Sequence, residues 1–149
     1  MSHRVIKGLR WSRPCARPSC IPQSRPRGAK GKGLTYERKL AKRLTELNHG
    51  QWFEFEDSNG HGYCQTDFIA ASQGVLYVLE CKYTWVIQGH LQIEQLYLPV
   101  LQAAQALPVF GFVVCKNLTS QMPKLQIAAS IGEAQELAQV GRTVWHWLG

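Results

Sequence analysis

The chain has 149 residues, 45% of them hydrophobic, which suits one domain with its own core and is too short for two domains of ordinary size. No apolar run approaches the length that crosses a bilayer, so we expect a soluble protein with no membrane partner. Five scattered cysteines, an odd number, exclude a disulfide framework and favour a reducing, cytoplasmic location.

The formal net charge of +7 is concentrated at one end of the chain. Residues 1–33 carry nine Lys or Arg and no acid, whereas residues 34–149 carry eight basic and ten acidic side chains. Four of the seven prolines also lie in residues 1–33, so we expect a mobile basic arm ahead of a folded domain over residues 34–149. Such an arm is typical of proteins that contact the phosphates of DNA, with a solubilising tail or a targeting peptide as alternatives. The side chains expected to contact DNA are Arg10, Arg13, Arg17, Arg25, Arg27, Lys30 and Lys32, together with Lys39 of the domain.

The spacing of Leu40, Leu44 and Leu47 predicts a helix from residue 34 to about residue 47. Glu37 falls on the apolar stripe of this helix, where a carboxylate needs a cation or a hydrogen-bond donor. The alternative is a hydrated Glu37 in the first turn, where its charge suits the helix dipole. We favour the inward position.

Residues 51–56 predict a first strand, and residues 57–62 predict a loop. Two apolar runs then flank Gln73-Gly74, which predicts a hairpin with a two-residue turn. Counting outward from that turn, Asp67 pairs with Glu80, and Lys82 lies on the same face two residues further on. Apolar residues on both faces of this hairpin predict central strands that are covered on both sides.

A helical pattern over residues 88–107, which Pro99 should kink or split, leads to a buried strand over residues 108–115. A strand, a helix and a strand in this order predict parallel pairing of the last strand. A short helix over residues 131–140 and an edge strand over residues 143–148 complete the prediction. The whole is an α/β fold with a mixed sheet.

Directly opposed like charges destabilise a sheet unless something binds between them, so Asp67 and Glu80 indicate a divalent cation. Mg²⁺ prefers oxygen ligands and usually takes one or two carboxylates from a protein, and the Cys81 carbonyl offers a further oxygen. Lys82 would orient a water molecule or neutralise charge on a phosphate, and Glu37 would complete the metal site. The alternative is a buried ion cluster of Lys82 with the two acids that only fixes strand register.

Three further polar side chains are accessory candidates. Gln92 and Gln95 follow the Glu80–Lys82 strand on the next helix, where an ordinary polar helix face explains them equally well. His61 lies in a glycine-flanked loop and could contact a phosphate, although a loop histidine without such a role is the commoner case.

Glu37, Thr66-Asp67 and Glu80-Cys81-Lys82 resemble the motif of the PD-(D/E)xK nuclease superfamily, with Thr66 in place of the proline. The resemblance covers about residues 34–117. It implies a restriction-endonuclease-like core of a helix, three strands, a helix and a strand. It further implies that Asp67, Glu80 and Glu37 bind Mg²⁺, or Mn²⁺ in its place, and that Lys82 acts in catalysis.

Within that superfamily, the small size and the basic residues resemble Holliday junction resolvases and phage recombination endonucleases. This finer resemblance implies cleavage of branched DNA in recombination or repair, in a bacterial or phage-infected cell. Because resolvases act through two sites, it also implies a homodimer. A nucleic-acid-binding module that does not cleave, and an exonuclease or nicking enzyme, remain alternatives.

Overall fold

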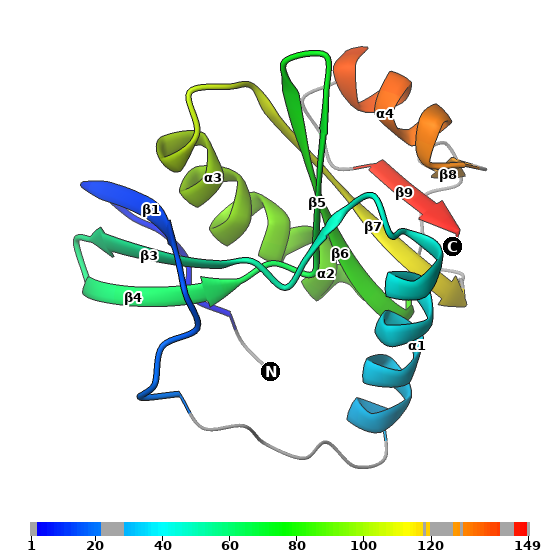
Figure 1. Ribbon diagram of the computed structural model, residues 1–149, viewed down its shortest axis with the longest axis horizontal. Coiled ribbons are helices and arrows are strands. Elements are labelled where there is room, and N and C mark those ends of the chain that lie inside the picture. The colour runs from blue at the N-terminus through cyan, green and yellow to red at the C-terminus, as the bar shows by residue number, and fades with distance from the viewer. Residues whose placement is uncertain are drawn as a thin grey trace.

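The computed structural model describes residues 3–21, 29–117, 119, 127–128, 130–140 and 145–148, and these residues form a mixed α/β fold with two sheets (Figure 1). The mixed class expected from the sequence is therefore confirmed. The larger sheet has the strand order β2-β5-β6-β7-β9-β8, and the smaller one the order β1-β3-β4. The elements in chain order are β1 (Trp11–Cys15), α1 (Ala29–Arg43), β2 (Asn48–His49), β3 (Trp52–Asp57), β4 (Gly60–Gln65), β5 (Phe68–Ser72), β6 (Val75–Thr84), α2 (Ile87–Gln92), the π-helical segment η1 (Ile93–Tyr97), α3 (Leu98–Ala104), β7 (Val109–Asn117), β8 (Ile127–Ala128), α4 (Ile131–Val140) and β9 (Trp145–Leu148).

The hairpin of β5 and β6 has the register that the sequence predicts. Ser72 pairs with Val75 across a turn in which Gln73 and Gly74 have φ angles of 52° and 77°. Positive φ at both central residues matches the right-handed twist of the strands and is easiest for a sequence that places Gly in the turn. β7 lies on the other side of β6 and runs parallel to it, as expected.

The larger sheet is covered on both faces, as predicted (Figure 1). On one face the side chains of Val78 and Val113 pack with Ile93 and Val100 of the helical layer formed by α2, η1 and α3. On the other face a second cluster, which includes Leu40 of α1 and Ala134 of α4, packs against alternate residues of the same strands. Since side chains alternate along a strand, each central strand contributes to both cores.

The helix that connects β6 to β7 is interrupted before Pro99, as its sequence predicts. Residues 93–97 form the π-helical segment η1, and the Leu98 N–H donates to the carbonyl of Ile93. Pro99 has no N–H to offer to the carbonyl of Gln95, four residues earlier. That carbonyl instead accepts a hydrogen bond of 2.9 Å from the N–H of Ile6, which ties the N-terminal segment to the helical layer.

The expectation of a mobile arm over residues 1–33 is wrong for the part that the structure describes. β1 pairs antiparallel with β3, and Ile6 and Leu9 pack against the core beneath the helical layer. The expected boundary at residue 33 falls inside α1, which begins at Ala29. The basic composition of this segment gave no indication of a strand. In the structure, Arg10 and Arg13 form ion pairs with acidic residues of β3.

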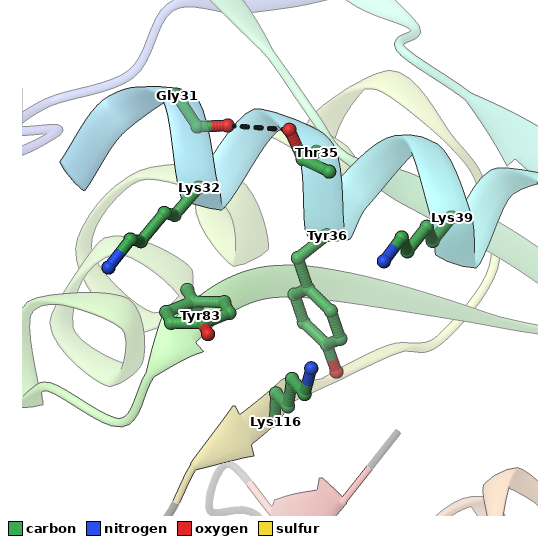
Figure 2. A pocket seen from close by; sticks show the side chains of 7 residues that line it. All are labelled: Gly31, Lys32, Thr35, Tyr36, Lys39, Tyr83 and Lys116. Atoms are coloured by element: carbon green, nitrogen blue, oxygen red, sulfur yellow. Dashed lines mark hydrogen bonds between the residues drawn. The ribbon is translucent and has the colours of Figure 1, made fainter. Parts of the chain in front are cut away.

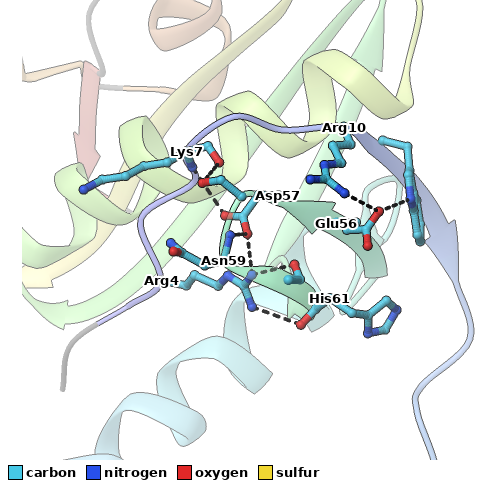
Figure 3. A network of polar contacts seen from close by, with 10 residues as sticks. Arg4, Lys7, Arg10, Glu56, Asp57, Asn59 and His61 are labelled. Atoms are coloured by element: carbon cyan, nitrogen blue, oxygen red, sulfur yellow. Dashed lines mark hydrogen bonds and ion pairs between the residues drawn. The ribbon is translucent and has the colours of Figure 1, made fainter.

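Asp57 holds the N-terminal segment in place (Figure 3). This carboxylate is 2% exposed, forms an ion pair with Arg4, and accepts hydrogen bonds from the N–H groups of Lys7 and Asn59. Arg4 also donates to the backbone carbonyls of Gly60 and His61. The hydrogen bond and the charge of Arg4 lower the pKa of Asp57 below its usual range.

Other boundaries differ from the prediction. α1 ends at Arg43, four residues before the expected end, and the strand expected over residues 51–56 belongs to the smaller sheet. The predicted loop over residues 57–62 contains the start of β4, which turns back on β3 after the side chain of Asp57 caps the turn. β9 is not an edge strand, because it lies between β7 and β8, and residues 143–144 of the expected strand lie outside the described residues.

Candidate metal-dependent site

The two acids and the lysine of the predicted site meet where β5 begins. Asp67 immediately precedes β5, at the position that the hairpin register places opposite Glu80. Its Oδ2 accepts a hydrogen bond of 2.7 Å from the N–H of Cys81. On β6, Lys82 Nζ lies 3.4 Å from Glu80 Oε1. The convergence that the sequence predicts for these three side chains is thus present in the structure.

Glu37 reaches the same place from α1, and its inward position is the one we favoured. Its side chain remains 23% exposed, and its Oε2 lies 2.7 Å from His49 Nε2. The His49 ring stacks on Phe68 with the ring centroids 4.7 Å apart, because β2 pairs with β5 at this point. His49 therefore orients Glu37 toward Asp67. The sequence analysis missed His49. This residue and Asn48 form the short strand β2 directly before Gly50.

The negative charges at this site lie close enough to affect one another. Burial raises the pKa of Asp67 well above its usual range, and the charges of Glu80 and Glu37 raise it further. The hydrogen bond from Cys81 N–H favours the ionised form but does not offset these effects. In the absence of a cation, the carboxyl groups of Asp67 and Glu80 therefore hold protons more tightly than carboxyl groups in water.

Glu80 has an acceptor atom without a donor. The residue is 4% exposed, and its Oε2 is buried and accepts no hydrogen bond from the part of the chain that the structure describes. Burial raises the pKa of Glu80, and the charge of Lys82 opposes this rise without cancelling it. A buried carboxylate oxygen without a donor is costly unless a cation or a proton lies against it.

Tyr97 of the helical layer lies close enough to Glu80 to be affected by its charge. Its hydroxyl donates to the carbonyl of Gln65 at 2.9 Å and accepts a hydrogen bond of 2.7 Å from Gln92 Nε2. Burial and the charge of Glu80 raise the pKa of Tyr97 well above its usual value, so the hydroxyl stays neutral. Gln92 is connected to the site through this hydroxyl. The sequence reasoning missed Tyr97, which reads there as one more apolar position.

Gly89 of α2 sets how closely the helical layer approaches Lys82. A Cβ at this buried position would lie 3.2 Å from Lys82 Cγ and 3.4 Å from Lys82 Cε. Glycine therefore lets the lysine stem lie flat against the helix with its ammonium group turned toward Glu80. A side chain at this position would require the lysine stem to shift.

Comparisons with known proteins add nothing to this geometry. No protein-family model, no curated protein sequence and no solved structure matches this chain. Among the helices of the described residues, none is both long and apolar enough to cross a membrane.

The donor chemistry fits a hard divalent cation, although the site is incomplete by itself. In the described ranges, no three His, Cys, Asp or Glu side chains are grouped closely enough to hold a metal ion. Mg²⁺ does not require such a group, since it usually binds one or two carboxylates and fills its octahedron with water and substrate phosphate. The unpartnered Oε2 of Glu80 and the crowded carboxylate of Asp67 are the oxygens that such an ion would use. The contact that Cys81 makes with the site is through its N–H, and no contact of its carbonyl supports the predicted role as a ligand.

Two of the accessory candidates lie away from these carboxylates. Gln95 Oε1 lies 2.7 Å from His3 Nε2 and so belongs to the anchored N-terminal segment. His61 lies on β4 in the smaller sheet, where its Nε2 is 2.7 Å from Glu54 Oε1. Within the part of the chain that the structure describes, the hydrogen-bond partners of both side chains are residues outside the site.

The basic side chains expected to contact DNA differ in whether they form contacts with the rest of the protein. Arg10 and Arg13 form ion pairs with Glu56 and Glu54, although both arginine side chains are more than half exposed. Arg17 donates to the carbonyl of Ile21. Arg25 and Arg27 lie outside the described residues, as does the side chain of Lys30, whereas Lys32 and Lys39 project from α1.

Proposed function

We propose that this protein is a Mg²⁺-dependent nuclease that hydrolyses phosphodiester bonds of DNA. The observation that carries the proposal is the meeting of Asp67, Glu80 and Glu37 with the ammonium group of Lys82, in a place where one carboxylate oxygen has no donor. Coupled carboxylates with raised pKa values and a lysine at one point are typical of functional sites.

Each side chain has a role that follows from its position. Asp67 and Glu80 would hold the cation, and a bound divalent cation would polarise the scissile phosphate and promote ionisation of a water molecule. Lys82, held 3.4 Å from Glu80, would place positive charge beside the phosphate as negative charge develops there. Glu37, oriented by His49, would accept a hydrogen bond from the attacking water.

A purely structural ion cluster explains the arrangement less well. One lysine faces three carboxylates, and its single ion pair among the described residues is with Glu80 Oε1. A cluster that served only to fix strand register would need a donor for the other Glu80 oxygen, because leaving a buried charge uncompensated is strongly destabilising.

The proposed assignment to a nuclease superfamily rests on the order of helices and strands along the chain. We propose that α1, the β5–β6 hairpin, the helical layer and the parallel β7 correspond to the core of PD-(D/E)xK nucleases. The further proposal of a Holliday junction resolvase-like enzyme rests on the sequence resemblance, and it requires a homodimer that presents two sites. Sedimentation of the protein with and without a DNA junction tests that requirement.

The test of the proposed function is cleavage of labelled DNA by the purified protein. Junction, flap, duplex and single-stranded substrates would be incubated with Mg²⁺ or with EDTA, using the wild type, Asp67→Asn and Lys82→Gln. Cleavage that needs Mg²⁺ and falls at least about a hundredfold in both variants is the expected result. Glu46→Gln is the matched control, since it removes an exposed carboxylate from the loop after α1 and should leave the rate unchanged. Binding without cleavage of any substrate would favour the non-catalytic alternative.

A further inference from the structure

A second feature of α1 is a cavity on the sheet face opposite to Lys82 (Figure 2). It lies between α1 and the ends of β6 and β7 and has a volume of about 430 Å³. Its described lining consists of Gly31, Lys32, Thr35, Tyr36 and Lys39 of α1, Tyr83 of β6 and Lys116 of β7. Because Tyr36 adjoins Glu37 and Tyr83 follows Lys82, the cavity and the catalytic carboxylates share one helix and one strand.

Three ammonium groups border this cavity, and none of its described lining residues carries a carboxylate. Within the described part of the chain, none of these three lysines, Lys32, Lys39 and Lys116, lies within ion-pair distance of an acid. Arg10 and Arg13, by contrast, are paired with acids on β3. Three ammonium groups without an ion pair among the described residues are therefore gathered around one cavity. Such a concentration attracts and holds an anion.

The size and the aromatic lining narrow the choice of anion. A volume of 430 Å³ lies in the range that holds a nucleotide-sized group and exceeds what one inorganic anion needs. Tyr83 is partly exposed, with its ring edge-on to Tyr36 at 6.3 Å between centroids and Lys116 Nζ 5.7 Å from the Tyr83 centroid. Lysines beside an exposed aromatic ring are the combination with which proteins hold single-stranded nucleic acid, since the amines neutralise phosphates and the ring contacts a base or a sugar.

We propose that this cavity binds the backbone of a single-stranded segment of the DNA substrate, with the three lysines on its phosphates. The proposal rests on the proposed function, because it makes the cavity a place where the DNA strand is held against the helix that carries Glu37 and the strand that carries Lys82. It assigns the protein to substrates that have an unpaired stretch near the scissile bond.

The experiment measures DNA binding without cleavage. Fluorescence anisotropy of a labelled single-stranded oligonucleotide, in EDTA and at several salt concentrations, would compare the wild type with Lys32→Gln/Lys39→Gln/Lys116→Gln. Each phosphate contact on a single strand contributes about 0.7 to the slope of log K against log salt, so the loss of two or three contacts should reduce the slope by about 1.4 to 2.1. Affinity at low salt should fall by about tenfold or more.

The matched control removes three cations from the same helix outside the cavity, in the variant Arg38→Gln/Lys42→Gln/Arg43→Gln. All three side chains are exposed, and none lines the cavity. The control should lose less than about threefold in affinity, because charges away from the bound strand are screened by salt. Equal losses in the two triple variants would show that binding follows overall surface charge and would overturn the proposal. Lys32→Glu, a single exposed change, provides a second variant, and thermal unfolding of each variant checks its fold.

Failure of this proposal and failure of the proposed function are distinguishable. A wild type that binds the oligonucleotide through the three lysines and cuts no DNA with Mg²⁺ would refute the nuclease and keep the cavity. A wild type that cuts DNA, with a triple lysine variant that binds and cuts equally well, would refute the cavity and keep the nuclease.

Discussion

Asp67→Asn should stabilise the protein while it abolishes cleavage. The carboxylate of Asp67 is held beside those of Glu80 and Glu37 in a partly buried place, and its pKa is raised accordingly. The variant keeps the shape of the side chain and an oxygen that can accept the hydrogen bond from Cys81 N–H. What it removes is one negative charge from a crowded group of three.

The expected gain follows from the repulsion that is relieved. Two like charges about 5 Å apart, at an effective dielectric constant of about 20, repel each other by about 3 kcal/mol. Proton uptake by the coupled carboxyl groups removes part of this, so we expect a gain of about 1 to 2 kcal/mol in the free energy of unfolding. For a chain of this length, each kcal/mol raises Tm by about 2 to 4 °C.

The assay is thermal unfolding of both proteins in EDTA as a function of pH. Because the pKa of Asp67 is raised, the folded wild type holds a proton over a pH range in which the unfolded chain has already released it, so its stability falls as the pH rises through that range. The gain from Asp67→Asn should therefore be largest at about pH 8 and vanish near pH 4, the ordinary carboxyl pKa. Mg²⁺ should raise Tm of the wild type and have much less effect on the variant, since it would bind the folded state through this carboxylate.

Two results would refute this reasoning. The first is a Tm of Asp67→Asn below that of the wild type at about pH 8 in EDTA, which would mean that Asp67 is a stabilising partner and not a crowded charge. The second is an equal rise in Tm with Mg²⁺ for both proteins, which would place the cation elsewhere. Glu46→Gln controls for the loss of a carboxylate at an exposed position and should match the wild type at every pH.

Three other changes test the anchoring of the N-terminal segment, the approach of α2 to Lys82 and the hydrogen bonds of Tyr97. Arg4→Met leaves buried Asp57 without its cation and should lower the free energy of unfolding by about 2 kcal/mol in urea. Because Arg4 lowers the pKa of Asp57, this difference should be present at neutral pH and shrink as the pH falls below about 4, and a difference that persists in acid would contradict the ion pair. Gly89→Val should push Lys82 aside, so that cleavage falls by about tenfold or more while DNA binding in EDTA is retained; unchanged cleavage would argue against a role for the lysine. Tyr97→Phe removes a buried hydroxyl that makes two hydrogen bonds and should destabilise the fold by about 1 kcal/mol, whereas a neutral effect would mean that those bonds contribute nothing.

The central hairpin could be predicted from the sequence because the signals that specify it are local. A turn pair with Gly at its second position fixes the register, and alternation then determines which side chains share a face. Asp67, Glu80 and Lys82 came together for that reason. The parallel β7 and the helix over residues 131–140 were likewise visible as uninterrupted apolar or periodic runs.

The smaller sheet could not be predicted because its pairing is long-range. β1 is specified less by its own residues than by the acids of β3, which lie more than 35 residues away in the sequence. The segment that contains β1 is basic and rich in proline, so the sequence alone predicts a mobile arm. The contact of His49 with Glu37 and the hydrogen bond from Tyr97 to the carbonyl of Gln65 depend in the same way on which strands and helices become neighbours. α1 began five residues earlier than expected because Gly31 and Gly33 weaken the local helical signal without preventing the helix.

The strand β1 also covers a strand edge that could otherwise pair with another molecule of this protein. A hairpin such as β3–β4 has a free edge whose backbone groups can pair with the same edge of another molecule. Here the chain covers that edge with its own N-terminal segment, and the arginines on this segment neutralise the acids that line the edge. Any cut or fusion that detaches residues 3–15 would therefore uncover a charged, unsatisfied strand, and self-association of the truncated protein is the outcome to expect.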